Sequence, residues 1–155
     1  MNVDIVIVNF NTCELLRECL VSISEAREEV DSMRTIVVDN ASTDASVSTI
    51  RSEFPWVELV PLPENLGFGA GNNRGVARGQ NEFILFLNSD AKLTPQALSR
   101  LASRLQASPL VVAVGPRLIY PDGSFQPSCR RFPTVWRWLW STTGLASRFP
   151  RTFKS

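Results

Sequence analysis

The sequence of 155 residues predicts an α/β fold with a mostly parallel central sheet flanked by helices. The short apolar run Ile5–Val8 is rich in β-branched residues and typical of a strand buried on both faces, and the apolar run Phe83–Leu87 also predicts a strand. Segments with apolar residues at helical spacing separate these runs between Asp4 and Val114. Strands that alternate with helices along the chain favour a parallel sheet covered by helices.

The first half of the chain predicts three strands, Ile5–Val8, Thr35–Val38 and Val57–Val60. Asn11 and Glu14 form an approximate capping box, which predicts the start of a helix after the first strand. The apolar residues of this helix recur at helical spacing: Leu15, Leu16, Cys19, Leu20 and Ile23. The second strand leads to Asp39, and we expect Ser42 or Thr43 to cap a short helix before the third strand.

The second half begins with a glycine-rich loop at 64–75, which is expected to run into a helix ending near Gly79. After the strand Phe83–Leu87, the pair Thr94–Pro95 predicts a helix start with proline at its first position. Val111–Val114 is expected to be a further strand. The segment Tyr120–Ser124 is typical of a turn, here between two strands.

The chain contains no histidine, and this excludes several kinds of catalytic site. It cannot form a Ser–His–Asp or Cys–His pair, a His-based zinc site or an imidazole general base. A general base would have to be mainly a carboxylate, and a metal held by oxygen ligands would be Mg²⁺ or Mn²⁺. A net charge of +1 gives no electrostatic reason to bind nucleic acid.

The cysteine pattern and the N-terminal sequence favour a cytoplasmic location for the protein. Cys13, Cys19 and Cys129 are odd in number and lack the spacing of a zinc or redox pair. This pattern is typical of a reducing compartment. The N-terminus has no signal-peptide pattern, and the longest apolar runs are too short to span a bilayer.

Polar residues follow the predicted strands at the point where each strand ends. They are Asn9, Asn11, Asp39, Asn40, Asn65, Asn88 and Asp90. Parallel strands end at one edge of a sheet, and open α/β sheets bind ligands there. Asp39 could accept hydrogen bonds from a ribose or a base, and Asp90 could hold a divalent ion on a diphosphate. Each residue alone also fits a plain turn or helix cap.

Gly67–Gly71 has the spacing G-x-G-x-G and follows the third predicted strand. It fits a loop with unusual backbone angles, or a close approach of backbone to a phosphate or ribose. Its spacing and position disfavour a dinucleotide-dependent oxidoreductase.

Residues 130–140 hold three tryptophans and three arginines. They fit either an amphipathic segment packed on protein or contact with a membrane surface, whereas RNA stacking is disfavoured.

The order of these motifs resembles the family 2 inverting glycosyltransferases of the GT-A fold, a Rossmann-like fold. The closest resemblance is to the bacterial rhamnosyltransferase-like branch, which builds cell-surface polysaccharide. Valine replaces the proline of the first motif. The matching segments, which cover about residues 3–134, are Val8–Asn11, Asp39–Asp44, Glu64–Gly67, Gly71–Gly75, Asn88–Asp90, Gly115–Leu118 and Tyr120–Gly123.

The resemblance implies a site that binds a nucleoside-diphosphate sugar. It places Phe10 against the base, Asp39 on the base or ribose, and Asp90 on a Mg²⁺ or Mn²⁺ ion at the diphosphate. Asn88 replaces the first aspartate of the family's metal motif, so it is expected to bond ribose or water. The nucleotide-binding residues implied are Val8, Phe10, Asn11, Asp39, Asn65, Gly67, Asn72, Asn88 and Ser89.

Family members continue into an acceptor region that carries the catalytic carboxylate. Beyond Asp122 this chain has no aspartate or glutamate, and Asp122 itself is a weak candidate because it lies in a predicted turn. The resemblance therefore implies a donor-binding GT-A core at residues 1–120. Residues 121–155 would be the start of an incomplete acceptor-side region, with the chain truncated at its C-terminus.

The leading hypothesis is the donor-binding part of a transferase that uses a dTDP- or UDP-sugar and a saccharide acceptor, which could be lipid-linked. One alternative is an active transferase whose base is Asp122 or comes from a partner chain. Another is a catalytically inactive nucleotide-binding or assembly module. Contact of Trp136–Trp140 with the inner face of the membrane is an alternative to the packing of this segment on protein. Trp136, Leu139 and Trp140 are expected to pack across a homodimer, or else the tail from Thr142 is disordered.

Overall fold

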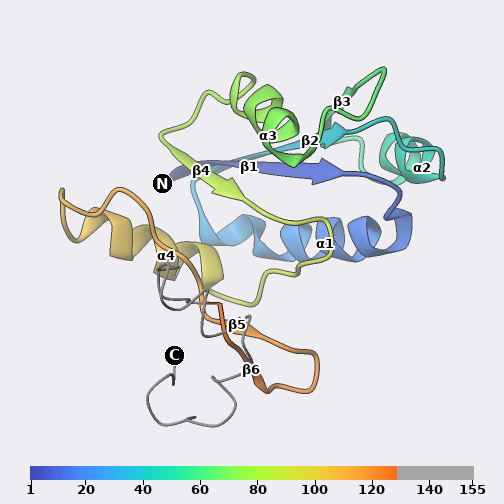
Figure 1. The fold of residues 1–155 in the computed structure, drawn as a ribbon. Helices are drawn as coiled ribbons and strands as arrows, with labels where there is room; N and C mark the ends of the chain where they lie inside the picture. Colours follow the sequence, from blue (N-terminus) through green and yellow to red (C-terminus); the bar gives the residue numbers. More distant parts are fainter. Residues whose placement is uncertain (129–155) are drawn as a thin grey trace, which may run out of the picture. The chain divides into compact units, whose positions relative to one another are not determined.

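The computed structural model describes residues 1–128 and divides the chain into two compact units, residues 1–114 and 115–155. The first unit carries the main sheet and most of the predicted site (Figure 1). Its elements in chain order are β1 (Asn2–Asn9), α1 (Cys13–Glu25), the short 3₁₀ helix η1 (Ala26–Glu29), β2 (Ser32–Asp39), α2 (Ser46–Glu53), β3 (Glu58–Pro61), α3 (Phe68–Val76), β4 (Phe83–Phe86) and α4 (Ala97–Gln106).

The four strands of the first unit form one parallel sheet in the order β3-β2-β1-β4, which confirms the predicted fold class. The register pairs Asn9 with Asp39 and Asp39 with Pro61. The last residues of three neighbouring strands are therefore side by side. This alignment brings together the polar groups that follow β1 and β2.

Helices cover both faces of the sheet, with α3 on one face and α1, α2 and α4 on the other (Figure 1). Alternate residues of β1 point to opposite faces, as the two-residue period of a strand requires. Ile5 and Ile7 join the core beneath α1, whereas Val6 packs with Ile36 and Val38 on the α3 side. All five side chains are fully buried, so β1 and β2 are apolar on both faces as their sequences predict.

Two glycines let α3 lie directly on β1. A Cβ atom at Gly71 would lie 2.9 Å from Cγ1 of Val8, and one at Gly75 would collide with Cγ1 of Val6. Gly67 lies just before the helix with φ of 82°, a conformation that favours glycine. The close packing of α3 on β1 and the positive φ of Gly67 are therefore enough to explain these three glycines without a ligand.

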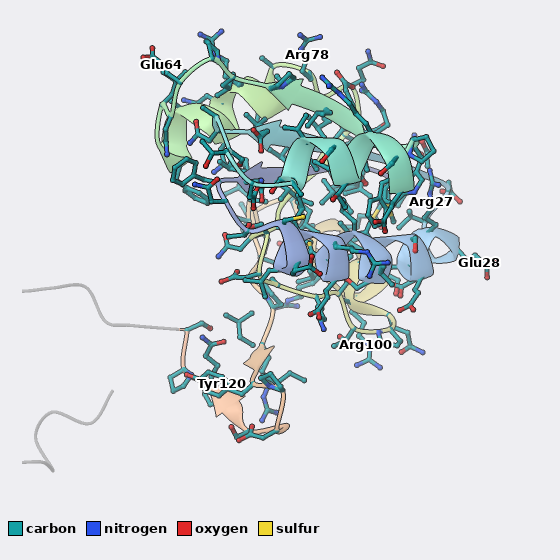
Figure 2. All side chains as sticks on the ribbon, turned by 90° about the vertical axis from the view of Figure 1, so that its right-hand side faces the viewer. Arg27, Glu28, Glu64, Arg78, Arg100 and Tyr120 are labelled. Atoms are coloured by element: carbon teal, nitrogen blue, oxygen red, sulfur yellow. The ribbon has the colours of Figure 1, made fainter. Side chains whose placement is uncertain are left out.

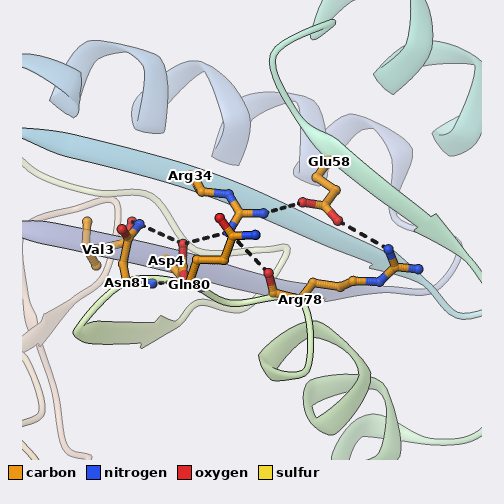
Figure 3. Close-up of polar contacts among 7 residues, drawn as sticks. All are labelled: Val3, Asp4, Arg34, Glu58, Arg78, Gln80 and Asn81. Atoms are coloured by element: carbon orange, nitrogen blue, oxygen red, sulfur yellow. Dashed lines mark hydrogen bonds and ion pairs between the residues drawn. The ribbon is translucent and has the colours of Figure 1, made fainter.

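Asp4 anchors the opposite, amino end of the sheet (Figure 3). Its carboxylate is fully buried, and Oδ2 accepts hydrogen bonds from the backbone N–H groups of Gln80 (2.5 Å) and Asn81 (2.8 Å). Oδ1 accepts from Nδ2 of Asn81 at 2.8 Å and lies 3.9 Å from the Arg34 guanidinium. Arg34 also donates to Glu58 at 2.7 Å. These contacts hold the connection between α3 and β4 against β1.

The predicted capping of the first two helices is wrong. α1 begins at Cys13 and Asn11 does not cap it, because Oδ1 of Asn11 accepts the N–H of Thr43 at 2.8 Å instead. α2 begins only at Ser46. Oγ of Ser42 accepts the N–H of Asn11 at 2.9 Å and so is used between loops rather than at a helix.

The predicted start of α4 at Thr94–Pro95 is also wrong. The helix begins at Ala97, after Gln96, whose φ of 64° is left-handed. The N–H of Gln96 donates to Oε1 of Glu29 at 2.6 Å. This contact with η1 is available only in the folded unit, which is why local sequence does not reveal it.

The second unit contains a short antiparallel hairpin of β5 (Leu118–Ile119) and β6 (Phe125–Gln126), so the predicted turn between two strands is confirmed. Gly123, with φ of 82°, occupies the turn. The predicted strand Val111–Val114 is wrong, since no strand within residues 1–128 pairs with it and Val112 is 93% exposed. Among residues 1–128, no helix combines the length and hydrophobicity needed to span a membrane.

Candidate functional site

A buried hydrogen-bonded cluster lies where β1 and β2 end. Nδ2 of Asn9 donates to Oδ1 of Asp39 at 2.9 Å and to Oγ of Ser42 at 3.1 Å. The N–H of Ser42 donates to Oδ2 of Asp39 at 2.9 Å. Asn9 is fully buried and Asp39 is only 2% exposed. Both carboxylate oxygens of Asp39 are thus held in place, each with one further lone pair.

The cluster continues to the segment after β4 through Thr12. Its hydroxyl donates to Oδ1 of Asn9 at 2.6 Å and is hydrogen-bonded to Oγ of Ser89 at 2.9 Å. Sγ of Cys19 on α1 lies 3.7 Å from the carbonyl oxygen of Asn88. The residues that follow β4 are therefore tied to both β1 and α1.

Asp44 connects the two helices beside this cluster. Its Oδ2 accepts the N–H of Cys13 at 2.9 Å and its Oδ1 accepts the N–H of Ser46 at 3.0 Å. Burial raises the pKa of Asp44, but the hydrogen bonds from Ser46 and Cys13 outweigh it and hold the pKa below its usual value. The sequence analysis placed Asp44 in a motif without a role. An aspartate often accepts the backbone N–H two residues further on, so the position of Asp44 before Ser46 could have indicated this contact.

Asn40 connects the end of β2 to the loop before α3. Its side chain is 3% exposed and bonds to Asn65, Leu66 and, through Asn65, Gly67. The sequence analysis named Asn65 and Gly67 as site residues but gave Asn40 no role. Asn65 bonds directly to Gly67, and Asn40 joins Asn65 to the end of β2.

The structure joins some of the predicted site residues and leaves others apart. Asn11, Asp39 and Ser89 belong to the cluster around Asn9. Phe10, 46% exposed, follows it in the chain. The remaining ones have other surroundings: Val8 packs on Gly71, Asn72 donates to the carbonyl of Phe68 at 3.0 Å within its own helix, and Asn88 and Asp90 are exposed.

The metal-binding groups are sparse. Among residues 1–128, the side chains form no group of three or more Asp, Glu, Cys or His that could hold a metal ion. An ion at Asp90 would therefore have at most two such ligands from the described part of the chain. Asp122 lies in the second unit, where Oδ1 accepts the N–H of Ser124 at 2.8 Å. The hydrogen bonds from Ser124 lower the pKa of its carboxyl.

A separate surface hollow of about 490 Å³ lies between the end of β3 and α3. Glu64 and Arg78, which line it, project outward from the α3 side of the sheet (Figure 2). Its lining residues are Val60, Leu62, Pro63, Glu64, Leu66, Arg74, Ala77 and Arg78, and none of them is a predicted site residue.

The model of the family described as glycosyl transferase family 2 matches residues 4–153. The chain belongs to glycosyl transferase family 2. This confirms the family resemblance inferred from the order of the strand-end motifs.

Curated relatives of this chain are longer than the chain itself. It is 30% identical over 144 residues to N-acetylglucosaminyl-diphospho-decaprenol L-rhamnosyltransferase of Mycobacterium tuberculosis, covering 86% of this chain and 46% of that protein. It is 32% identical over 104 residues to poly(ribitol-phosphate) beta-glucosyltransferase of Bacillus spizizenii, covering 64% and 16%. The chain thus spans less than half the length of these relatives.

Solved structures share the fold of the first unit. TarS 1–349 of S. aureus matches with a TM-score of 0.60 at 22% identity, covering 69% of this chain and 33% of that one. The mannosyltransferase PcManGT of Pyrobaculum calidifontis, solved with GDP-Man and Mn²⁺, matches with a TM-score of 0.59 at 25% identity, covering 70% and 33%. These matches support the GT-A core predicted from the sequence.

Proposed function

We propose that this chain is the donor-binding part of a glycosyltransferase that moves a sugar from a nucleoside-diphosphate sugar to a saccharide acceptor with inversion, in cell-surface polysaccharide synthesis. The observation that carries the proposal is the buried Asn9–Asp39–Ser42 cluster, which fixes a carboxylate at the sheet edge where α/β folds bind ligands. Relatives whose names describe sugar transfer favour this over an inactive module.

In this proposal the nucleotide lies along the ends of β1 and β2. Phe10 is half exposed and offers an aromatic face to the base, while Asp39 accepts a hydrogen bond from the base or ribose. Asn11 uses Oδ1 on Thr43, so Nδ2 is the atom it has for a ligand. Gly67, which has no side chain, lets the backbone approach the ligand closely. The remaining proposed contacts are Val8, Asn65, Asn72, Asn88 and Ser89.

Asp90 is the proposed ligand of a divalent ion. Mg²⁺ commonly binds through one or two carboxylates together with phosphate oxygens and water, so one exposed carboxylate fits an ion that arrives with the diphosphate. The PcManGT structure, which holds GDP-Man and Mn²⁺, supports a divalent ion in this family. When bound, the ion would neutralise charge on the departing diphosphate. Asn88 would bond ribose or a water beside it.

The acceptor and the cellular setting are the finer parts of the proposal. The name of the mycobacterial relative includes a diphospho-decaprenol, so a lipid-linked saccharide is the proposed acceptor. This would place the protein in the cytoplasm at the inner face of the membrane. The predicted membrane contact at Trp136–Trp140, the homodimer contact and the disordered tail lie outside the described residues and stay predictions. Asp122 stays a weak candidate for the base.

Calorimetric titration of the chain with UDP and dTDP in the presence of Mn²⁺ tests donor binding. We expect one of the two to bind, and we expect Asp90→Asn to weaken binding only when Mn²⁺ is present, because Asp90 acts through the ion. A Phe10→Ala variant should weaken binding with or without the ion. A folded sample that binds neither nucleotide would contradict the proposal.

A further inference from the structure

The side chain of Asn40 makes a two-sided contact with the loop that precedes α3. Nδ2 of Asn40 donates to Oδ1 of Asn65 at 2.7 Å, and Oδ1 of Asn40 accepts the N–H of Leu66 at 2.9 Å. Oδ1 of Asn65 also accepts the N–H of Gly67 at 2.9 Å. Asn40 is 3% exposed, whereas Asn65 lies on the surface. We call these three hydrogen bonds the Asn40 clasp.

The backbone fixes which way both amides point. The N–H of Leu66 can only donate, so the atom of Asn40 that faces it is Oδ1, and Nδ2 must face Asn65. The N–H of Gly67 likewise requires an acceptor from Asn65. A single oxygen of Asn65 therefore receives both donors. A carboxylate at position 40 would keep the bond to Leu66 but could not donate to Asn65.

The clasp holds the part of the loop between β3 and α3 that the contacts on either side do not fix. On one side, the N–H of Leu62 donates to the carbonyl of Asp39 at 2.8 Å, which fixes the end of β3. On the other side, Gly71 and Gly75 seat α3 on β1. Between these anchors, the clasp joins the Leu66–Gly67 peptide to Asn40, the residue that follows β2 and comes directly after Asp39.

We propose that Asn40 is a positioning residue for nucleotide binding: its amide orients Asn65 and so places the Leu66–Gly67 backbone beside Asp39. Asn40 itself is buried and does not need to touch the ligand. An aspartate at position 40 would leave Gly67 without its acceptor, because Asn65 would turn Nδ2 toward the new carboxylate. The inference rests on the proposed function.

The test compares isosteric variants of the full chain. Asn40→Asp removes the donor of the clasp, whereas Asn65→Asp keeps an acceptor for both donors. Asn65→Ala removes that acceptor at an exposed position, so it folds even if Asn40→Asp does not. Asn73→Asp, an exposed position on α3, controls for the added charge. The readouts are nucleotide affinity with Mn²⁺, and backbone amide hydrogen exchange at Leu66 and Gly67.

We expect Asn40→Asp and Asn65→Ala to weaken nucleotide binding by about tenfold or more, as expected when a buried hydrogen-bonding group loses its partner. Both should speed exchange at Gly67, while Leu66 stays protected in Asn40→Asp. Asn65→Asp should lose less affinity than Asn40→Asp, and Asn73→Asp less than either. If Asn65→Ala and a folded Asn40→Asp bind as the wild type does, or if Asn65→Asp is the weakest of the set, the positioning role is wrong. If the wild type binds no nucleotide, the proposed function fails as well.

Discussion

The carboxylate of Asp44 accepts the backbone N–H of Cys13, 31 residues earlier in the chain, at 2.9 Å. Cys13 is the first residue of α1, and the other oxygen of Asp44 accepts the N–H of Ser46, the first residue of α2. The first N–H groups of a helix have no partner within the helix. One carboxylate therefore caps two helices, with its negative charge at the positive end of both dipoles.

Asp44→Asn should destabilise the protein at neutral pH by about 1 kcal/mol, the usual magnitude for a lost N-cap. The effect should depend on pH because the pKa of Asp44 is lowered in the folded state. The carboxylate's contribution is complete above its unfolded pKa and is lost as pH falls through the lower folded pKa. Urea unfolding between pH 7 and pH 2.5 measures this.

The wild type and Asp44→Asn should converge in stability below the usual aspartate range. Glu64→Gln is the matched control, since Glu64 is exposed and its side chain accepts no hydrogen bond within residues 1–128. That variant should leave the wild-type stability curve unchanged within about 0.5 kcal/mol. A constant difference between wild type and Asp44→Asn from pH 7 to pH 2.5 would contradict the double cap.

Asp4→Asn should be more costly, about 2–4 kcal/mol, because Asp4 is fully buried and all its partners are donors. The new amide would turn N–H groups toward the N–H groups of Gln80 and Asn81. Equilibrium unfolding in urea gives the difference. Glu53→Gln breaks the exposed pair between Glu53 and Arg17 and should cost under about 1 kcal/mol. Equal losses in the two variants would show that burial of Asp4 does not matter.

The sequence was sufficient for the sheet because its signals are local. Runs such as Ile5–Val8 are apolar on both faces whatever surrounds them, so the strands, their parallel direction and the edge that carries Asn9 and Asp39 could be predicted. Val111–Val114 has the same local pattern but forms no strand in residues 1–128. A strand also needs a neighbour with which to pair, and a local pattern carries no information about the neighbour.

The helix caps and the clasp could not be predicted because their partners are distant in the chain. Asn11 has the residue type of an N-cap, yet its oxygen bonds Thr43, while Asp44 accepts the N–H of Cys13, the first residue of α1. Asn40 is joined to Asn65 across 25 residues. A polar side chain can form hydrogen bonds with several partners. Which of these bonds it forms is settled only when the folded sheet brings the loops together.

Cys19 should resist thiol reagents in the folded protein. Burial, with a smaller contribution from the charge of Asp90, raises the pKa of its thiol to about 12. At pH 8 only about one thiol in ten thousand would be the reactive thiolate. In a Cys129→Ser background, iodoacetamide followed by mass spectrometry should modify the half-buried Cys13 before Cys19. Modification of Cys19 should require urea. Equal labelling of both in buffer would contradict its burial beneath β4.

Gly75→Ala and Gly69→Ala should have opposite effects on stability, although both lie within α3. A Cβ at Gly75 would collide with Cγ1 of Val6 in the sheet, whereas one at Gly69 would meet nothing within 4 Å. Overpacking should make Gly75→Ala less stable by about 1–3 kcal/mol. Gly69→Ala should gain up to about 1 kcal/mol, because alanine favours the helix and restricts the unfolded chain. Thermal unfolding of the two variants shows whether each change raises or lowers the stability. If Gly75→Ala were as stable as Gly69→Ala, the close seating of α3 on β1 would be wrong.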